Sequence, residues 1–109
     1  MKIETISING FKNGGATTDD LIDLTNFAFT GAQRGVVDVS AKVLATTDLT
    51  SVTGLFTDVA GNRGVATSYI GADTYVMVDV NKDGNFTVAD DLIVKFVATA
   101  SITLSDLGM

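Results

Sequence analysis

The sequence predicts an α+β fold that is mainly β, with antiparallel strands and hairpins packed with one or two short helices at about residues 48–60. Short segments rich in β-branched and aromatic residues alternate with Gly, Asn and Asp turns, which is the pattern of consecutive strands. Twelve of the thirteen acidic residues are Asp, which favours turns and caps, and one is Glu, which favours helices. The length fits a single domain over residues 1–109.

Five segments carry the strand pattern. Ile6 and Ile8 alternate with polar residues near the start of the sequence. Residues 75–80 are apolar on both faces, which is typical of a central buried strand, and a turn at 71–74 joins them to the preceding strand as a hairpin. Residues 92–97 fit a strand and a helical stripe equally well, and their β-branched content favours the strand. The expected strands are residues 2–8, 20–24, 64–70, 75–80 and 92–97.

One segment has helical periodicity. Its apolar residues recur at spacings of three and four, which places them on one face of a helix: Leu49, Val52, Phe56 and Val59. A Thr-Asp pair before the segment offers an N-cap, and a Gly-Asn pair after it offers a stop. Gly54 inside the segment costs about 1 kcal/mol relative to Ala, so this helix would need tertiary packing.

The composition excludes several functions. The chain has a formal net charge of −6 and seven scattered basic residues, so it lacks the basic clusters that bind nucleic acid. It has no Cys and no His, which removes disulfides, thiol nucleophiles and the commonest general base. No apolar run approaches the ~20 residues of a membrane span, and the first residues lack the apolar stretch of a secretory signal. We therefore expect a non-catalytic protein with no nucleic-acid partner and no membrane span.

The sharpest motif is a twelve-residue loop, residues 79–90, that fits the EF-hand pattern. A hard cation such as Ca²⁺ takes six to eight oxygen ligands, and side chains at positions 1, 3 and 5 converge on it when a glycine at position 6 allows the turn. Position 7 offers a carbonyl oxygen, position 9 a water-mediated contact and position 12 a closing carboxylate. The predicted calcium ligands are Asp79, Asn81, Asp83, Asn85, Thr87, Asp90 and Asp91.

Two features distinguish this loop from an EF-hand. Asp90 stands where the EF-hand has the longer Glu, so it would ligate through one oxygen or share the task with Asp91. The residues before the loop have the pattern of a strand, which gives a calcium loop in a β setting. A plain Asn-Lys-Asp-Gly turn without an ion would explain some of these residues, and the spacing favours calcium over it. The expected dissociation constant lies in the range of about 10⁻⁴–10⁻³ M found for extracellular modules.

A weaker motif precedes the second expected strand. Residues Gly14–Ile22 match the G-G-x-G-x-D-x-U-x repeat of calcium-binding parallel β-rolls at four of five fixed positions, with Thr17 in place of a glycine. A Gly-Gly turn before a strand explains the same residues. As a relic rung, the segment would belong to a domain that caps a parallel β-roll, whose other rungs are missing here.

Three segments together resemble a known family. The sequence TYVMVDVNKDG at 74–84 is followed by ADDLIVKF at 89–96 and by ITLSDL at 102–107. These segments resemble the C-terminal region of RTX-type proteins, which include serralysin-like proteases, large adhesins and surface-layer proteins exported by bacterial type I secretion. The earlier DLIDLTNF at 20–27 is similar to the family's D-x-IDLS-x-F segment.

The resemblance implies a C-terminal domain that carries or supports an uncleaved export signal. Its partners would be the calcium ion, the type I secretion transporter, and β-roll or adhesin domains upstream. The protein would be secreted or held on the bacterial cell surface, and it would fold on calcium binding outside the cell.

Two other functions fit parts of the sequence. The loop is close to a dockerin calcium segment, for which residues 92–100 would form the following helix. Dockerins carry two such segments, however, and this sequence has one. A calcium-independent β domain for protein interaction, such as an adhesin subunit, would need no ion and would fold stably in a chelator.

Overall fold

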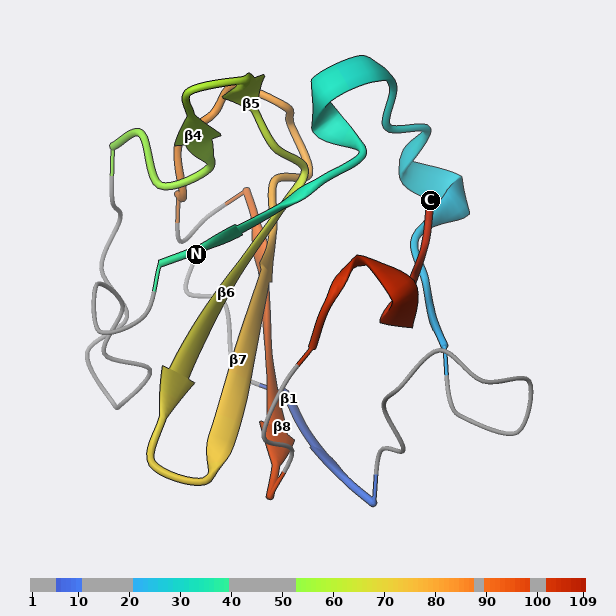
Figure 1. Ribbon diagram of the computed structural model, residues 1–109, viewed down its shortest axis with the longest axis vertical. Coiled ribbons are helices and arrows are strands. Elements are labelled where there is room, and N and C mark those ends of the chain that lie inside the picture. Colours follow the sequence, from blue (N-terminus) through green and yellow to red (C-terminus); the bar gives the residue numbers. More distant parts are fainter. Residues whose placement is uncertain (1–5, 11–20, 40–52, 88–89, 99–101) are drawn as a thin grey trace.

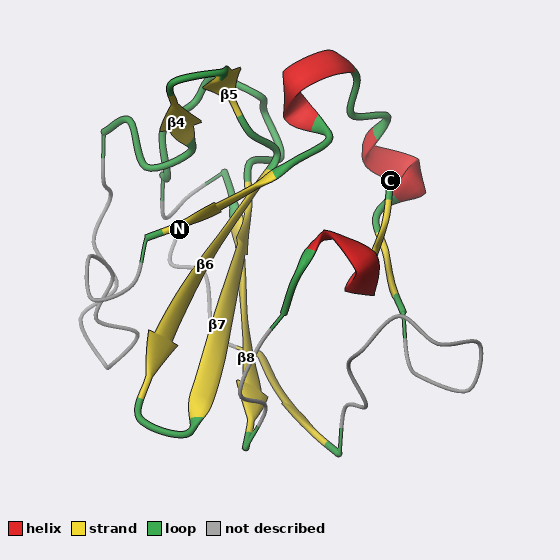
Figure 2. Ribbon diagram, viewed as in Figure 1, coloured by secondary structure: helices red, strands yellow, loops and turns green. Residues whose placement is uncertain are grey.

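The computed structural model describes residues 6–10, 21–39, 53–87, 90–98 and 102–109, and this part of the chain is rich in strand, which confirms the mainly β prediction (Figures 1 and 2). Its helices are three short 3₁₀ turns: η1 (Thr25–Phe27), η2 (Gly31–Gln33) and η3 (Leu104–Asp106). Its strands are β1 (Ile6–Asn9), β2 (Ile22–Asp23), β3 (Val36–Asp38), β4 (Thr57–Asp58), β5 (Gly61–Asn62), β6 (Val65–Ile70), β7 (Asp73–Val78), β8 (Leu92–Val97) and β9 (Leu107–Gly108).

The main sheet has five strands in the order β1-β8-β7-β6-β3. β6 and β7 form the predicted hairpin, and Gly71 takes the positive φ of +63° that its tight turn requires. β8 pairs with β7 in antiparallel fashion, but the outer pairs β1–β8 and β3–β6 are parallel. The prediction of antiparallel strands is therefore incomplete, because parallel pairs join segments far apart in the sequence and leave no local turn signal.

The central strand β7 is buried on both faces, as its sequence predicts. Tyr75 and Met77 pack on one face, while Val76 and Val78 pack on the other. The first face is covered by a cluster that includes Leu55, Phe56 and Phe86, and the second is covered by residues of the 24–29 and 102–107 segments. The parallel β2–β9 pair contributes Ile22 and Leu107 to the second cluster, and the β4–β5 hairpin directly follows Leu55 and Phe56 of the first.

The helix expected at 48–60 is wrong for the residues that the structure describes. Residues 53–60 form a turn, strand β4 and a second turn. Gly54 has a φ of +71°, and the Phe56 N–H donates to the distant Gly84 carbonyl instead of a helical partner. Phe56 is buried while Val59 is fully exposed, so the regular spacing does not form one buried face.

Other predictions lie outside the described residues. These are the first part of the relic repeat, which falls in 11–20, and the start of the expected helix, which falls in 40–52. Within the described part of the chain, no helix has the length and apolar character needed to cross a membrane.

Candidate metal centre

Three aspartates meet where β7 ends and β8 begins. Asp79 directly follows β7, Asp91 directly precedes β8, and Asp83 lies in the loop between them. Because the last residue of β7 pairs with the first residue of β8, the flanking residues are brought side by side. Each of the three offers a carboxylate oxygen, and these oxygens all lie within 4.8 Å of one another. We refer to Asp79, Asp83 and Asp91 as the aspartate cluster.

The loop is shaped by hydrogen bonds from its own backbone. The Gly84 N–H donates to Asp79 Oδ2 at 2.8 Å, and the Asn85 N–H donates to Asp83 Oδ1 at 2.9 Å. Gly84 has a φ of +82°, a conformation that side-chain-bearing residues adopt only at a cost. The glycine predicted at position 6 is therefore needed for the turn that aims two carboxylates at the same point.

Asp91, and not Asp90, closes the cluster. Asp91 is fully buried, and its two oxygens accept the Val80 N–H at 2.9 Å and the Thr87 N–H at 2.8 Å. Asp90 is exposed and lies outside the cluster, where its Oδ2 accepts the Thr87 hydroxyl at 3.2 Å. Asp90 lies in a turn, where its N–H donates to the Thr87 carbonyl at 3.2 Å, whereas Asp91 lies directly before the paired strand β8.

The remaining predicted ligands make supporting contacts. Asn81 Nδ2 donates to Asp83 Oδ2 at 3.3 Å, and the Thr87 hydroxyl also lies 3.3 Å from Asp91 Oδ2. The Asn85 side chain instead accepts the Gly54 N–H at 2.8 Å. These contacts hold two of the carboxylates in place and tie the loop to another part of the chain.

Asp79 has the least satisfied carboxylate of the aspartate cluster. The residue is 1% exposed, and its Oδ1 atom is buried with no hydrogen-bond partner among the described residues. Burial raises the pKa of Asp79 to about 6; the Gly84 N–H acts in the opposite direction, and the charges of Asp91 and Asp83 raise the pKa further. Burial also raises the pKa of Asp91, against the hydrogen bonds that it accepts. The ionised cluster is therefore costly to fold on its own.

No basic side chain in the described residues neutralises the cluster. The ion pairs found there are Arg63–Asp58 and Lys95–Asp73. Lys82 lies within the loop, but its ammonium group is 3.5 Å from the Ala28 carbonyl and 5.7 Å from the centre of the Phe29 ring. A buried carboxylate needs a cation or a proton to balance it.

The donor set fits a hard divalent cation. Carboxylate and carbonyl oxygens suit Ca²⁺, Mg²⁺ and Mn²⁺, whereas zinc and copper sites use the His and Cys that this chain lacks. Thr67 and Ser68 also have buried hydroxyls that find no partner among the residues described, but a neutral hydroxyl costs far less to bury than a carboxylate. Of these three buried oxygens, only Asp79 Oδ1 belongs to a charged group, which needs a positive charge to balance it.

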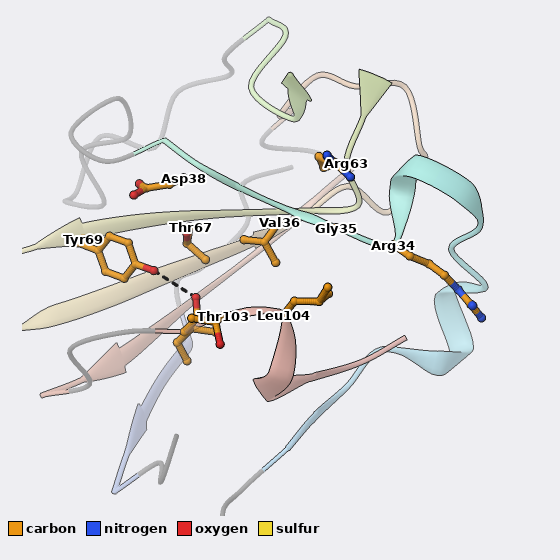
Figure 3. Close-up of a pocket in the computed structure, with 10 residues that line it drawn as sticks. Arg34, Gly35, Val36, Asp38, Arg63, Thr67, Tyr69, Thr103 and Leu104 are labelled. Atoms are coloured by element: carbon orange, nitrogen blue, oxygen red, sulfur yellow. Dashed lines mark hydrogen bonds between the residues drawn. The ribbon is translucent and has the colours of Figure 1, made fainter. Parts of the chain in front are cut away.

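A second feature is an open pocket of about 380 Å³ between β3, β6 and the C-terminal segment (Figure 3). The Tyr69 hydroxyl donates across it to the Ile102 carbonyl at 3.1 Å. Its two arginines already donate to protein oxygens, Arg34 to Phe29 and Arg63 to Asp58 and Ala32. The pocket is therefore a weaker candidate for a ligand site than the aspartate cluster. Its lining comprises Arg34, Gly35, Val36, Asp38, Arg63, Thr67, Tyr69, Ile102, Thr103 and Leu104.

No protein-family model, curated protein or solved structure matches this chain. The aspartate cluster is therefore characterised by its own geometry: three convergent carboxylates, one of them buried with a free oxygen, at the end of the central strand.

Proposed function

We propose that the chain is a non-catalytic calcium-binding domain, in which the aspartate cluster holds the ion. The observation that carries the proposal is Asp79 Oδ1, a buried carboxylate oxygen that has no partner in the described part of the chain and belongs to a group of three convergent carboxylates. Asp79 is buried directly after the central strand, so its charge affects the stability of the whole sheet and not only that of a surface loop.

Each ligand has a distinct task in this proposal. Asp79 would bind the ion through its free oxygen, and the buried Asp91 would bind it from the protein interior. The exposed Asp83 would bind it from the solvent side. The Asn85 carbonyl and a water held by Thr87 are the further ligands that the EF-hand spacing predicts. A bound calcium ion supplies the positive charge that offsets the burial of the carboxylates.

Calcium binding would couple to folding. An ion that binds the folded chain alone stabilises it by RT ln(1+[L]/Kd), which is about 2.7 kcal/mol at a hundredfold excess over Kd. Domains are stable by roughly 5–15 kcal/mol, so this is a large share. Such a domain would be loosely folded where calcium is scarce and firmly folded where it is plentiful.

This behaviour suits a protein that leaves the cell unfolded. With the resemblance to RTX-type C-terminal regions, it supports a domain of a type I secreted bacterial protein that carries or supports the export signal. The domain would fold outside the cell or on the cell surface. The type I transporter and upstream β-roll or adhesin domains would be its partners, and its position at the end of a parallel β-roll belongs to the same proposal.

The test is calorimetric titration of calcium into the wild type, Asp83→Ala and Asp23→Ala. Asp83 and Asp23 are both exposed, and each accepts the N–H of the residue two positions later, so the two variants lose the same kind of local contact. Saturable binding to the wild type and Asp23→Ala, with at least about tenfold weaker binding to Asp83→Ala, is expected. A wild type without binding heat, and with one melting temperature in chelator and in several millimolar calcium, would falsify the proposal.

The structure weighs against the dockerin-like alternative. A dockerin segment needs a helix after the loop, and Leu92–Val97 forms strand β8, paired with both β7 and β1. A calcium-independent β domain for protein interaction is the second candidate. Stable folding in chelator, together with no binding heat in the calcium titration, would favour it.

A further inference from the structure

We propose that the calcium loop is a clamp for the β4–β5 hairpin, so that calcium binding orders the hairpin and an ordered hairpin in turn raises the affinity for calcium. The inference rests on the proposed calcium site and adds the element that the site controls. Figure 1 shows both hairpin strands at the end of the sheet where the chain passes from β7 to β8.

Two hydrogen bonds join the segment before β4 to the loop. The Phe56 N–H donates to the Gly84 carbonyl at 3.1 Å, and the Gly54 N–H donates to Asn85 Oδ1 at 2.8 Å. Both acceptors belong to loop positions 6 and 7, which take their conformation from the turn around the aspartate cluster. A change in that turn therefore moves both acceptors together.

Close packing reinforces these bonds. The α-carbon of Gly84 faces the Asn62 side chain of β5 so closely that an added Cβ would lie 2.7 Å from its Oδ1. The rings of Phe56 and Phe86 are both fully buried, with their centres 6.4 Å apart. The loop thus supplies one backbone acceptor, one side-chain acceptor, the space beside the Gly84 α-carbon and the aromatic ring against which this hairpin packs.

The hairpin has little support of its own. β4 and β5 have two residues each and pair only with each other among the described strands. A two-stranded hairpin in isolation is marginally stable at best. Within it the Arg63 N–H donates to the Phe56 carbonyl at 2.7 Å, and Arg63 pairs with Asp58. An element this small takes its order from its neighbours, and coupling between two sites is reciprocal by linkage.

The first test is amide hydrogen exchange of the wild-type chain during a calcium titration. The reporter is the Arg63 amide, which closes the hairpin without touching the loop. Calcium is expected to slow its exchange by about tenfold more than it slows the amides that pair β6 with β7. Equal slowing at both hairpins overturns the clamp, because it shows global stabilisation and nothing specific to β4–β5.

The second test compares the calcium affinities of Asn85→Ala and Asp73→Ala. Each variant loses the side-chain acceptor of a backbone N–H, of Gly54 and Ala98 respectively. Asp73→Ala also loses the ion pair with Lys95, and Asp73 lies at the far end of β7 from the cluster. Asn85→Ala keeps its carbonyl and is expected to bind calcium several-fold more weakly, while Asp73→Ala binds like the wild type. Equal affinities overturn the clamp and leave the calcium site standing, whereas a wild type that binds no calcium removes the proposed function itself.

Discussion

Replacing Asp79 with Asn should have opposite effects with and without calcium. In the calcium-free chain the buried carboxylate has one oxygen satisfied by the Gly84 N–H and one without a partner. The amide introduced by Asp79→Asn would remove the charge, could still accept the Gly84 N–H through its oxygen, and would turn its NH₂ donors toward the carboxylates of Asp83 and Asp91. Repulsion inside the cluster would thus become attraction.

The magnitude follows from the pKa of Asp79. Its rise from 3.8 to about 6 corresponds, at 1.36 kcal/mol per pKa unit, to a cost of about 3 kcal/mol for keeping the ionised group in the folded chain at neutral pH. The amide must still be desolvated, so Asp79→Asn is expected to recover about 1–2 kcal/mol of this in chelator. For a chain of this size each kcal/mol moves the melting temperature by about 4–8 °C.

The assay is thermal unfolding at neutral pH in chelator and in several millimolar calcium. The wild type should melt higher with calcium, and Asp79→Asn should melt above the wild type in chelator but gain nothing from calcium. Asp73→Asn is the control, because that residue lies at the other end of β7 and is paired with Lys95. If Asp79→Asn melts below the wild type in chelator and keeps the full calcium gain, burial of this charge is not what the ion offsets.

Three further predictions concern the same loop. In chelator, stability should rise as pH falls from about 7 to 4 and should be lost as pH rises through the folded pKa of Asp79, about 6, because the raised pKa favours the protonated folded chain. Asp23 and Asp58, whose pKa values are lowered, act below 3.8, and a denaturation series with the opposite slope contradicts the prediction. In urea unfolding, Gly84→Ala should destabilise the fold by about 1–3 kcal/mol more than Gly71→Ala. Both glycines have positive φ, but only at Gly84 would the new Cβ lie 2.7 Å from another side chain, and equal losses of stability would show that this contact is easily relieved. Asp91→Asn should weaken calcium binding by about tenfold or more and Asp90→Asn by less than about twofold in calorimetry, and the reverse order would return the closing position to Asp90.

The sheet was largely predictable because its strongest signals are local. The double-sided apolar run at 75–80 and the turn at 71–74 predict the central hairpin, and the structure contains it as β6 and β7. The observed β7 begins earlier than predicted, at Asp73, and ends at Val78, so the turn is confined to residues 71 and 72. The parallel partners β1 and β3 could not be paired from sequence, since nothing nearby in the chain specifies which strand a parallel edge will join.

The expected helix over 48–60 failed for a long-range reason. Its spacing of apolar residues is real, but Phe56 packs on Phe86 and gives its N–H to Gly84, while Val59 occupies an exposed turn. Contacts with the loop some thirty residues later outweigh a weak helical propensity that already contained a glycine. Helix propensity determines the conformation of an isolated segment, whereas tertiary contacts determine the conformation of this one.

The choice between Asp90 and Asp91 shows the limit of a motif. The twelve-residue pattern counts positions from an EF-hand, in which a helix follows the loop and places position 12 toward the ion. Here a strand follows, and its pairing with β7 turns the residue at position 13 inward. The signal that could have found Asp91 was its phase along the strand, because Asp91 lies two residues before the buried Ile93, whereas Asp90 is in phase with the exposed Leu92.

The dissociation constant for calcium decides whether the ion can switch the domain between a loosely folded and a firmly folded state. The burial of Asp79 costs about 3 kcal/mol, and calcium supplies about 2.7 kcal/mol only at a hundredfold excess over Kd. If Kd were about 10⁻³ M, millimolar calcium would supply about 0.4 kcal/mol, which leaves most of that cost in place. A switch that works at millimolar calcium therefore requires a Kd of about 10⁻⁵ M, tighter than the loop sequence alone predicts. The hydrogen bonds that hold the three carboxylates in place before any ion binds would act in this direction, because preorganisation lowers the cost of binding. Calorimetry that returns about 10⁻⁵ M supports calcium-driven folding, and about 10⁻³ M reduces the ion to a minor support of a domain that folds without it.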